Sequence, residues 1–209
     1  MTKHFDQAAQ NWDKNPIHLE ITQAIASALL EMVPLRKDMK VMEFGSGTGL
    51  LSFALKDYLA EITLMDSSIE MNRQAIAKVA TRSAYHLKPL HFDLEKDEYV
   101  TGTFDVIFTQ MAMHHVKNVP AMVNKFYNLL NPGGYVVIAD LFTEDGTFHD
   151  SNFDGHFGFE PDFIINILTN VGFSDVVLKP CFVIKRYHEK TGEKAFPVFI
   201  TVAKKKYEI

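Results

Sequence analysis

Apolar runs alternate along this chain with longer segments in which apolar residues recur every three to four positions. The second pattern predicts amphipathic helices, because it places the apolar residues on one helical face. The segments that show it are 17–33, 50–59, 69–81, 120–130 and 161–171. The apolar runs predict buried strands at 39–44, 62–65, 87–92, 104–108 and 135–139. This alternation predicts an α/β fold with a mostly parallel sheet and helices on both faces.

The last third of the chain has a different pattern. Two β-rich stretches, 176–187 and 196–204, are joined by the short segment 189–193, which predicts an antiparallel hairpin. Asn131-Pro132-Gly133-Gly134 predicts a break before the strand at 135–139. The basic run Lys204-Lys205-Lys206 is interpreted as a solvated strand end.

Polar side chains stand at or near the ends of the predicted strands. They are Glu43, Asp66, Asp93, Gln110 and Asp140. In an open parallel sheet the ligand lies outside the carboxyl ends of the strands, at the point where the strand order reverses. We therefore expect these residues to share one crevice.

A glycine-rich turn follows the first strand, in Glu43-Phe44-Gly45-Ser46-Gly47-Thr48-Gly49-Leu50. Its backbone N–H groups favour a nucleotide ligand. A dinucleotide fingerprint needs G-x-G-x-x-G, but here the third glycine comes one residue early and Leu50 stands in its place. The chain has no Gly-Lys-Ser/Thr sequence either, which excludes a Walker phosphate loop.

The carboxylates indicate the charge of the ligand. Glu43 beside the turn would repel a pyrophosphate but suits a cationic or ammonium-bearing group. Asp66 is placed to accept bonds from both hydroxyls of a ribose, and Asp93 from an exocyclic amine such as adenine N6. An adenosine with a positive tail fits all three, and S-adenosylmethionine is such a molecule.

Charge and composition limit the partners and the compartment. The formal net charge is −5 and no basic face stands out, so we expect no nucleic-acid partner. The one cysteine, Cys181, excludes an internal disulfide and favours a reducing compartment. The first residues lack the apolar core of a signal peptide, and no apolar run is long enough to span a bilayer. These features predict a soluble, cytoplasmic protein without a membrane partner, and leave its oligomeric state open.

With the glycine turn and the strand-end acids in place, a family resemblance is plain. The chain resembles class I S-adenosylmethionine-dependent methyltransferases, in the small-molecule branch that includes the quinone-biosynthesis C-methyltransferases. The motifs that carry it span about residues 39–140, and are Val41-Met42-Glu43-Phe44-Gly45-Ser46-Gly47-Thr48-Gly49, Leu64-Met65-Asp66-Ser67-Ser68, His91-Phe92-Asp93-Leu94, Phe104-Asp105-Val106-Ile107-Phe108 with Met113-His114-His115-Val116, and Leu129-Leu130-Asn131-Pro132-Gly133-Gly134. One glycine motif alone would be a weak signal, whereas five motifs in the order typical of the family are specific.

The resemblance implies a Rossmann-like, seven-stranded sheet of order 3-2-1-4-5-7-6 with strand 7 antiparallel. It implies that Glu43 and the glycine turn hold the methionine end, Asp66 the ribose, and Asp93 with Leu94 the adenine. The full implied set of cofactor-binding residues is Trp12, Glu43, Gly45, Ser46, Gly47, Thr48, Gly49, Asp66, Ser67, Met71, Asp93, Leu94, Gln110 and Met111.

We divide the chain on this basis into parts of one methyltransferase domain, residues 1–209. Residues 1–36 form an N-terminal helical lid that carries Trp12, and residues 37–140 form the cofactor-binding core. Residues 141–209 comprise an acceptor loop, a helix and the C-terminal hairpin.

The sulfonium methyl group is already activated, so direct in-line transfer needs mainly alignment and exclusion of water. Acceptors that must lose a proton need a base. The candidates are His115, after strand 4, and His156, in the acceptor loop. Local packing of His114 and His115 is the competing interpretation.

The acceptor loop is rich in aromatic residues, which predict either an acceptor pocket or a loop whose rings are core: Phe142, Phe148, Phe153, Phe157 and Phe159. His149, Asp150, Asp154 and His156 match no standard zinc spacing, so no metal is expected.

Other functions remain open at this point. A nicotinamide-dependent oxidoreductase shares the fold and an acid after strand 2, but Glu43 and Leu50 argue against it. A non-catalytic protein that binds S-adenosylmethionine would keep the same acids. The four residues Thr109-Gln110-Met111-Ala112 stand where a nucleic-acid methyltransferase has an Asn/Asp-Pro-Pro-Tyr/Phe motif. The acceptor, and whether O, N, S or C is methylated, are not predicted.

Overall fold

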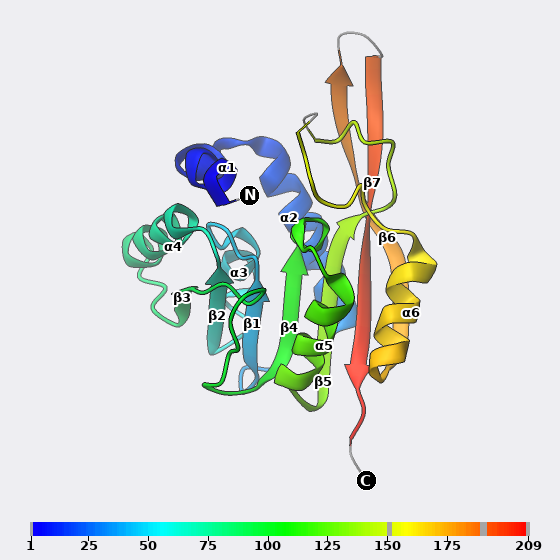
Figure 1. Ribbon diagram of the computed structural model, residues 1–209. Helices are drawn as coiled ribbons and strands as arrows, with labels where there is room; N and C mark the ends of the chain where they lie inside the picture. The colour runs from blue at the N-terminus through cyan, green and yellow to red at the C-terminus, as the bar shows by residue number, and fades with distance from the viewer. Residues whose placement is uncertain (1, 150–151, 189–191, 208–209) are drawn as a thin grey trace.

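The computed structural model describes residues 2–149, 152–188 and 192–207. The strands are β1 (Lys40–Phe44), β2 (Glu61–Asp66), β3 (Leu87–His91), β4 (Phe104–Gln110), β5 (Leu130–Leu141), β6 (Phe173–His188) and β7 (Gly192–Lys205). They form a sheet of order β3-β2-β1-β4-β5-β7-β6 (Figure 1). β1 to β5 are parallel, and β7 is antiparallel to both β5 and β6. The predicted α/β fold and strand order are confirmed.

Helices precede, connect and cover these strands. They are α1 (Thr2–Ala8), the 3-10 helix η1 (Ala9–Lys14), α2 (Pro16–Met32), α3 (Leu50–Leu55), α4 (Ile69–Thr81), the 3-10 helix η2 (Met113–His115), α5 (Val119–Leu129) and α6 (Pro161–Val171). The ends of α4 and α6 agree with the sequence pattern. Ser68 caps α4 by accepting a hydrogen bond from the Met71 N–H, and Gly172 ends α6 with a left-handed φ of 114°.

The sheet separates two hydrophobic cores. Successive residues of a strand point to opposite faces, so Val41 packs with α2 and α3 while Met42 packs with α5 and α6. Leu64 and Met65 of β2 divide in the same way. This alternation gives the parallel strands their nearly continuous apolar sequence, because both faces are covered.

Some boundaries differ from the sequence pattern. The helix expected over 50–59 ends at Leu55. β5 begins at Leu130, so the predicted break at 131–134 lies within the strand, where its register against β4 shifts between Phe104 and Val106. A side chain at Gly134 would place its Cβ 2.8 Å from the Asp105 carbonyl oxygen, so this position of the strand has room only for glycine. Residues 189–191 of the predicted turn lie outside the described residues.

The carboxyl ends of β1, β2, β4 and β5 meet at one edge of the sheet. α1 and η1 lie above β1 and β2 at this edge, and the loop that follows β5 lies at the same end beside the hairpin (Figure 1). Within the described residues, no helix has the length and apolar character that crossing a bilayer requires.

The interpretation of 204–206 as a solvated strand end is wrong for Lys205. Its side chain is buried, and Nζ donates 2.8 Å hydrogen bonds to the carbonyl oxygens of Tyr127 and Leu130. These carbonyls lie at the C-terminal end of α5, where the last C=O groups have no partner within the helix. The ammonium group therefore ties β7 to α5.

We expect Lys205→Met to lower the free energy of unfolding by about 1–3 kcal/mol, because methionine keeps the apolar stem but leaves two carbonyls without their charged donor. The exposed neighbour provides the control, since Lys206→Met should change stability by no more than about 0.5 kcal/mol. Denaturant unfolding of both variants measures the difference. Equal stabilities would contradict the assigned role of Lys205.

Candidate active site

The glycine turn joins β1 to α3, and its three glycines all have positive φ: 65° at Gly45, 54° at Gly47 and 81° at Gly49. A Cβ at Gly45 would lie 2.5 Å from Cβ of Ala112, and one at Gly49 would lie 2.5 Å from Cδ2 of Leu64. The turn is therefore packed too closely for side chains at these two positions.

Asp66, at the end of β2, is bound to two backbone donors. Its Oδ2 accepts a 2.7 Å hydrogen bond from the Gly47 N–H, and its Oδ1 accepts one of 2.7 Å from the Ser68 N–H. Each carboxylate oxygen can accept a further bond, so both remain able to receive the hydroxyls of a ribose. Burial raises the pKa of Asp66, while the two N–H donors lower it.

Glu43, at the end of β1, is buried, and its Oε2 accepts hydrogen bonds from both N–H and Oγ of Ser52 in the first turn of α3. It thus caps α3 from outside the helix. The described hydrogen bonds use Oε2, which leaves Oε1 to accept from a ligand. Burial raises the pKa of Glu43 to about 8, against the opposing effect of the Ser52 bonds and the Lys78 charge.

The N-terminal segment contacts the turns that follow β1 and β2. Oδ1 of Asp6 accepts a 2.6 Å bond from Ser68 Oγ. Asp13 accepts a 2.5 Å bond from Thr48 Oγ1 and pairs with Lys78 Nζ at 2.5 Å. Nε1 of Trp12 lies 4.0 Å from the position that a Cβ on Gly47 would occupy. The residues expected to form a lid therefore lie against the glycine turn.

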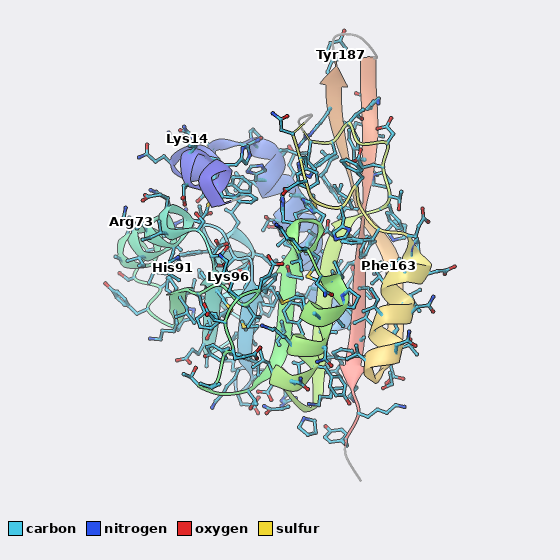
Figure 2. The ribbon with its side chains drawn as sticks, in the orientation of Figure 1. Lys14, Arg73, His91, Lys96, Phe163 and Tyr187 are labelled. Atoms are coloured by element: carbon cyan, nitrogen blue, oxygen red, sulfur yellow. The ribbon has the colours of Figure 1, made fainter. Side chains whose placement is uncertain are left out.

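The end of β3 is more open. Asp93 accepts a 3.1 Å bond from the Glu95 N–H and forms a 2.7 Å ion pair with Lys96, an exposed residue labelled in Figure 2. The Leu94 side chain is buried in the core with α5, so only its backbone is free to meet an adenine. Ser67 is exposed after β2, and its carbonyl accepts a 3.2 Å bond from His91 Nε2.

The end of β4 offers an unpaired acceptor. Gln110 donates a 2.8 Å bond from Nε2 to Thr22 Oγ1 of α2, and its buried Oε1 has no partner among the described residues. Met111 follows with a φ of 52°, and its N–H donates to the Ala139 carbonyl at 2.8 Å. The Met71 side chain lies near the same region, with Sδ 3.8 Å from the Gly47 Cβ position.

Histidines gather between η2 and the loop after β5. His114 is buried, with Nδ1 2.6 Å from Asp140 Oδ1, and its N–H donates to the other carboxylate oxygen at 3.1 Å. His115 lies edge-to-face with Phe5 of α1 and with Phe153, at ring distances of 5.0 and 5.3 Å. His149 is stacked on Phe153 at 3.8 Å. The lid, η2 and the acceptor loop thus meet at His115.

Burial keeps the rings of His115 and His149 neutral. It lowers the pKa of His115 to about 2, with a contribution from the neighbouring His114 and His149 rings. It lowers the pKa of His149 to about 4, helped by His114 and the Arg186 charge. Both rings therefore keep an unprotonated nitrogen that can accept a bond at neutral pH.

His156 has a different environment. Its Nε2 lies 3.0 Å from the Val116 carbonyl oxygen, and its N–H donates to the His114 carbonyl at 2.7 Å. These bonds hold the acceptor loop to η2. Of the four residues considered from the sequence as a metal set, Asp150 lies outside the described residues, and Asp154 and His156 belong to no metal-sized group of described residues.

The five phenylalanines of the acceptor loop differ in their burial. Phe148 and Phe159 are buried in the two cores, and Phe142 packs against the second of these. Phe157 is exposed, whereas Phe153 lies against His115 and His149. The expectation that these rings are core holds for the first group, and Phe153 is the ring that faces the histidines.

Comparison with known proteins identifies the family. The profile described as a methyltransferase domain matches residues 17–177. An uncharacterized methyltransferase of Schizosaccharomyces pombe is 31% identical over 157 residues, which are 67% of this chain and 55% of that protein. A malonyl-[acyl-carrier protein] O-methyltransferase of Marinomonas sp. is 24% identical over 141 residues, 68% of this chain and 51% of that protein. The chain spans about half the length of these relatives.

A solved structure has the same fold. Phosphoethanolamine N-methyltransferase 2 of Haemonchus contortus, in complex with phosphomonomethylethanolamine and S-adenosylhomocysteine, superposes with a TM-score of 0.69 at 16% identity, over 87% of this chain and 52% of that one. The fold and the motif order define the class I S-adenosylmethionine-dependent methyltransferases, and the chain belongs to the methyltransferase-domain family. The assignment to a quinone-biosynthesis branch stays a prediction.

Several residues at this edge were not predicted from the sequence. Asp6 and Asp13 lie in the segment assigned to the lid, but only the fold brings them to Ser68 and Thr48. Ser52 lies in the predicted helix after the turn, where its spacing of nine residues from Glu43 gives no signal of contact. Asp140 was expected in the crevice, though not as the partner of His114.

We expect S-adenosylmethionine binding to release about one proton from Glu43 at pH 7, because a cationic ligand favours the carboxylate over the acid form. Affinity should rise about tenfold per pH unit below pH 8 and level off above it. The stability of the fold depends on pH in the opposite direction. The pKa of Glu43 is higher in the folded chain than in the unfolded chain, so its protonation favours folding below pH 4.5, and this contribution is lost as the pH rises through 8.

Calorimetry in two buffers of different ionisation enthalpy counts the proton, and Glu43→Gln should release none. Equal heats for the native protein in both buffers would show that Glu43 is already ionised or is not the group that titrates.

We expect Asp13→Ala to weaken S-adenosylhomocysteine binding about fivefold, mainly through faster dissociation, since the bonds from Asp13 to Thr48 and Lys78 hold the lid on the glycine turn. Lys14→Ala is the matched control, because Lys14 is exposed and its described hydrogen bond stays within the lid (Figure 2). Stopped-flow release of the ligand measures the effect. A native dissociation rate in Asp13→Ala would mean that these contacts do not retain the ligand.

Proposed function

We propose that this chain transfers the methyl group of S-adenosylmethionine directly, in line, to a small-molecule acceptor, with S-adenosylhomocysteine as the by-product. The observation that carries this proposal is the arrangement at the carboxyl edge of the sheet. The glycine turn, the Asp66 carboxylate and the lid residues lie against one another there, and the His115–Phe153 contact lies at the same end. The glycine turn, Asp66 and the lid residues suit a cofactor, and the His115–Phe153 contact suits an acceptor.

The cofactor set proposed is the one expected from the resemblance. Oε1 of Glu43 and the unpaired Oε1 of Gln110 are acceptors suited to the ammonium group of the methionine end. Asp66 keeps acceptor capacity for the ribose hydroxyls, and Trp12 covers the turn at Gly47. Residues 1–36 then act as the lid and 37–140 as the cofactor-binding core of one domain.

The acceptor is proposed to bind between the lid and residues 141–159. Phe5 of the lid and Phe153 of the loop both contact the His115 ring, so a molecule bound against His115 is shielded from water on two sides. Such a site fits a small molecule with an apolar or aromatic body. His115 is proposed as the residue that meets the reacting group, while catalysis by His156 stays a prediction that its bond to Val116 does not favour.

The names of two similar proteins support a small methyl-accepting group, free or bound to a carrier. One relative is named for O-methylation of a carrier-bound malonyl group, and the similar structure for N-methylation of phosphoethanolamine. These two proteins are named for methylation of different atoms, oxygen and nitrogen, on different acceptors. Their names therefore do not indicate which atom or acceptor this chain methylates. Its acceptor has to be identified by assay.

We expect Asp66→Ala to weaken S-adenosylhomocysteine binding at least about 100-fold, because it removes the ribose acceptor and frees the Gly47 N–H that shapes the turn. The control is Asp57→Ala, an exposed carboxylate paired with its neighbour Lys56. Calorimetry measures both, with thermal unfolding to show that each variant folds. Unchanged affinity in Asp66→Ala would overturn the ribose assignment.

Turnover is tested by following S-adenosylhomocysteine formation from S-adenosylmethionine over a panel of phenols, amines, thiols and carboxylates. The proposal expects an acceptor that gives turnover, which His115→Ala reduces while leaving S-adenosylhomocysteine affinity unchanged. Tight cofactor binding without turnover on any acceptor would favour the non-catalytic alternative.

A further inference from the structure

Three histidines from two distant parts of the chain form a compact group. His114 and His115 belong to η2, and His149 to the loop after β5. One ring nitrogen from each lies within 4.8 Å of the others, and this is the metal-sized group found among the described residues. The group differs from the one considered in the sequence, with which it shares only His149.

Two ring nitrogens of this group have no hydrogen-bond partner among the described residues. Nδ1 of His115 and Nε2 of His149 are both enclosed, and neither has a hydrogen-bond partner among the described residues. A buried imidazole nitrogen without a partner loses the free energy of that bond, so such atoms mark a place where a ligand is missing. Both residues belong to the group whose ligand atoms lie within 4.8 Å of one another, which indicates a shared ligand.

His114 is oriented as a metal ligand is. Its Nδ1 is bound to Asp140 at 2.6 Å, which leaves Nε2 as the atom available for coordination. The carboxylate also accepts a hydrogen bond from the His114 N–H and is completely buried, so the ring cannot turn freely. A carboxylate that binds the far nitrogen of a metal-ligating histidine fixes the ring and supplies negative charge near the ion.

The distances allow a tetrahedral site after small side-chain movements. With metal–nitrogen distances of about 2.1 Å, the nitrogens of such a site lie about 3.4 Å apart. His149 is half-buried on a loop and stacks on Phe153, so rotation of its side chain can bring its nitrogen closer. Three imidazole ligands select a borderline transition metal such as Zn²⁺ over Mg²⁺ or Ca²⁺, which require oxygen ligands.

We propose that His114, His115 and His149 bind one divalent transition-metal ion, and that its open coordination position holds the heteroatom of the acceptor. The metal site stands on the histidine geometry alone, whereas the acceptor's part in it rests on the proposed methyl transfer. Three protein ligands leave one position of a tetrahedral ion open. Phe5 of the lid and Phe153 of the loop both pack against His115, one of the three ligands.

The site would determine the chemical class of the acceptor. An alcohol, phenol or thiol that coordinates the ion loses its proton to solvent water, because the cation lowers the pKa of the bound group. The lone pair of the resulting oxyanion or thiolate forms a bond to the methyl carbon as the carbon–sulfur bond of the sulfonium breaks. The sulfur keeps that electron pair, so the products are neutral S-adenosylhomocysteine sulfur and a neutral ether or thioether.

Metal binding is tested on the full chain after removal of metals with a chelator. Co²⁺ is titrated in, because its visible absorption reports tetrahedral coordination, and calorimetry gives the stoichiometry. We expect one Co²⁺ per chain in the native protein. Asp140→Asn should lower the affinity for Co²⁺ by roughly 10–100-fold, because it removes the carboxylate partner of a ligand. His149→Ala removes a ligand itself and should lower the affinity for Co²⁺ further.

His86→Ala is the matched control, since His86 lies before β3 at the opposite end of the sheet and binds the Lys56 carbonyl. It should bind Co²⁺ as the native protein does. No one-to-one binding, or native affinity in His149→Ala when thermal unfolding shows a folded variant, would overturn the site. Azide serves as the probe of the open position, and an unchanged Co²⁺ spectrum on its addition would overturn the acceptor's place on the ion.

S-adenosylhomocysteine binding is measured on the same samples. Binding of Co²⁺ without binding of the nucleoside would overturn the proposed function and leave the metal site standing. Binding of the nucleoside without binding of Co²⁺ would do the reverse.

Discussion

The carboxylate of Asp66 is the interaction on which the candidate site depends. It stands at the end of β2 and accepts hydrogen bonds from the N–H groups of Gly47 and Ser68, one on each oxygen. Those two residues belong to the turns after neighbouring parallel strands, so one side chain sets the distance between the two turns. Both bonds are charge-assisted, which makes them shorter and stronger than bonds between neutral groups. The shape of the turn is therefore fixed before any ligand arrives.

The position of the lid follows from the same turns. Ser68, whose N–H binds Asp66, uses its hydroxyl to bind Asp6 in α1, and Thr48 of the glycine turn binds Asp13 in η1. Lys78 of α4 completes this arrangement by pairing with Asp13. The N-terminal segment is therefore held both by the two turns and by α4.

The sequence predicted what depends on local patterns. Strands and helices follow from periodicity. The edge of the candidate site follows from the parallel order, because Glu43, Asp66 and Gln110 all lie at or next to the end of a strand. It failed where a residue's environment is decided by segments far away in the chain. Lys205 is one of three consecutive lysines, and only the approach of β7 to the end of α5 shows why this one is buried.

The contacts within the histidine group could not be predicted from the sequence either, because they also join segments that are far apart in the chain. His149 lies 34 residues after His115 in the numbering, and the possible ligands considered with it from the sequence were its own neighbours Asp150, Asp154 and His156. Glu43 shows a different limit, because its joint placement with Asp66 predicted a ligand contact, while the structure shows that it also caps α3. One carboxylate serves both purposes, and a sequence pattern does not separate them.

The sheet register explains how the histidine group comes to exist at all. Gln110 at the end of β4 is opposite Ala139 of β5, so the next residue of β5, Asp140, lies beside the segment that leaves β4. That segment turns into η2 within a few residues, and His114 reaches Asp140 with both its ring and its backbone N–H. His115 follows directly and is turned toward Phe5 of the lid. The histidine group is therefore positioned by the pairing of β4 with β5, just as the glycine turn and Asp66 are positioned by β1 and β2. Chemistry that joins the two has to occur across β1 and β4, where the strand order reverses.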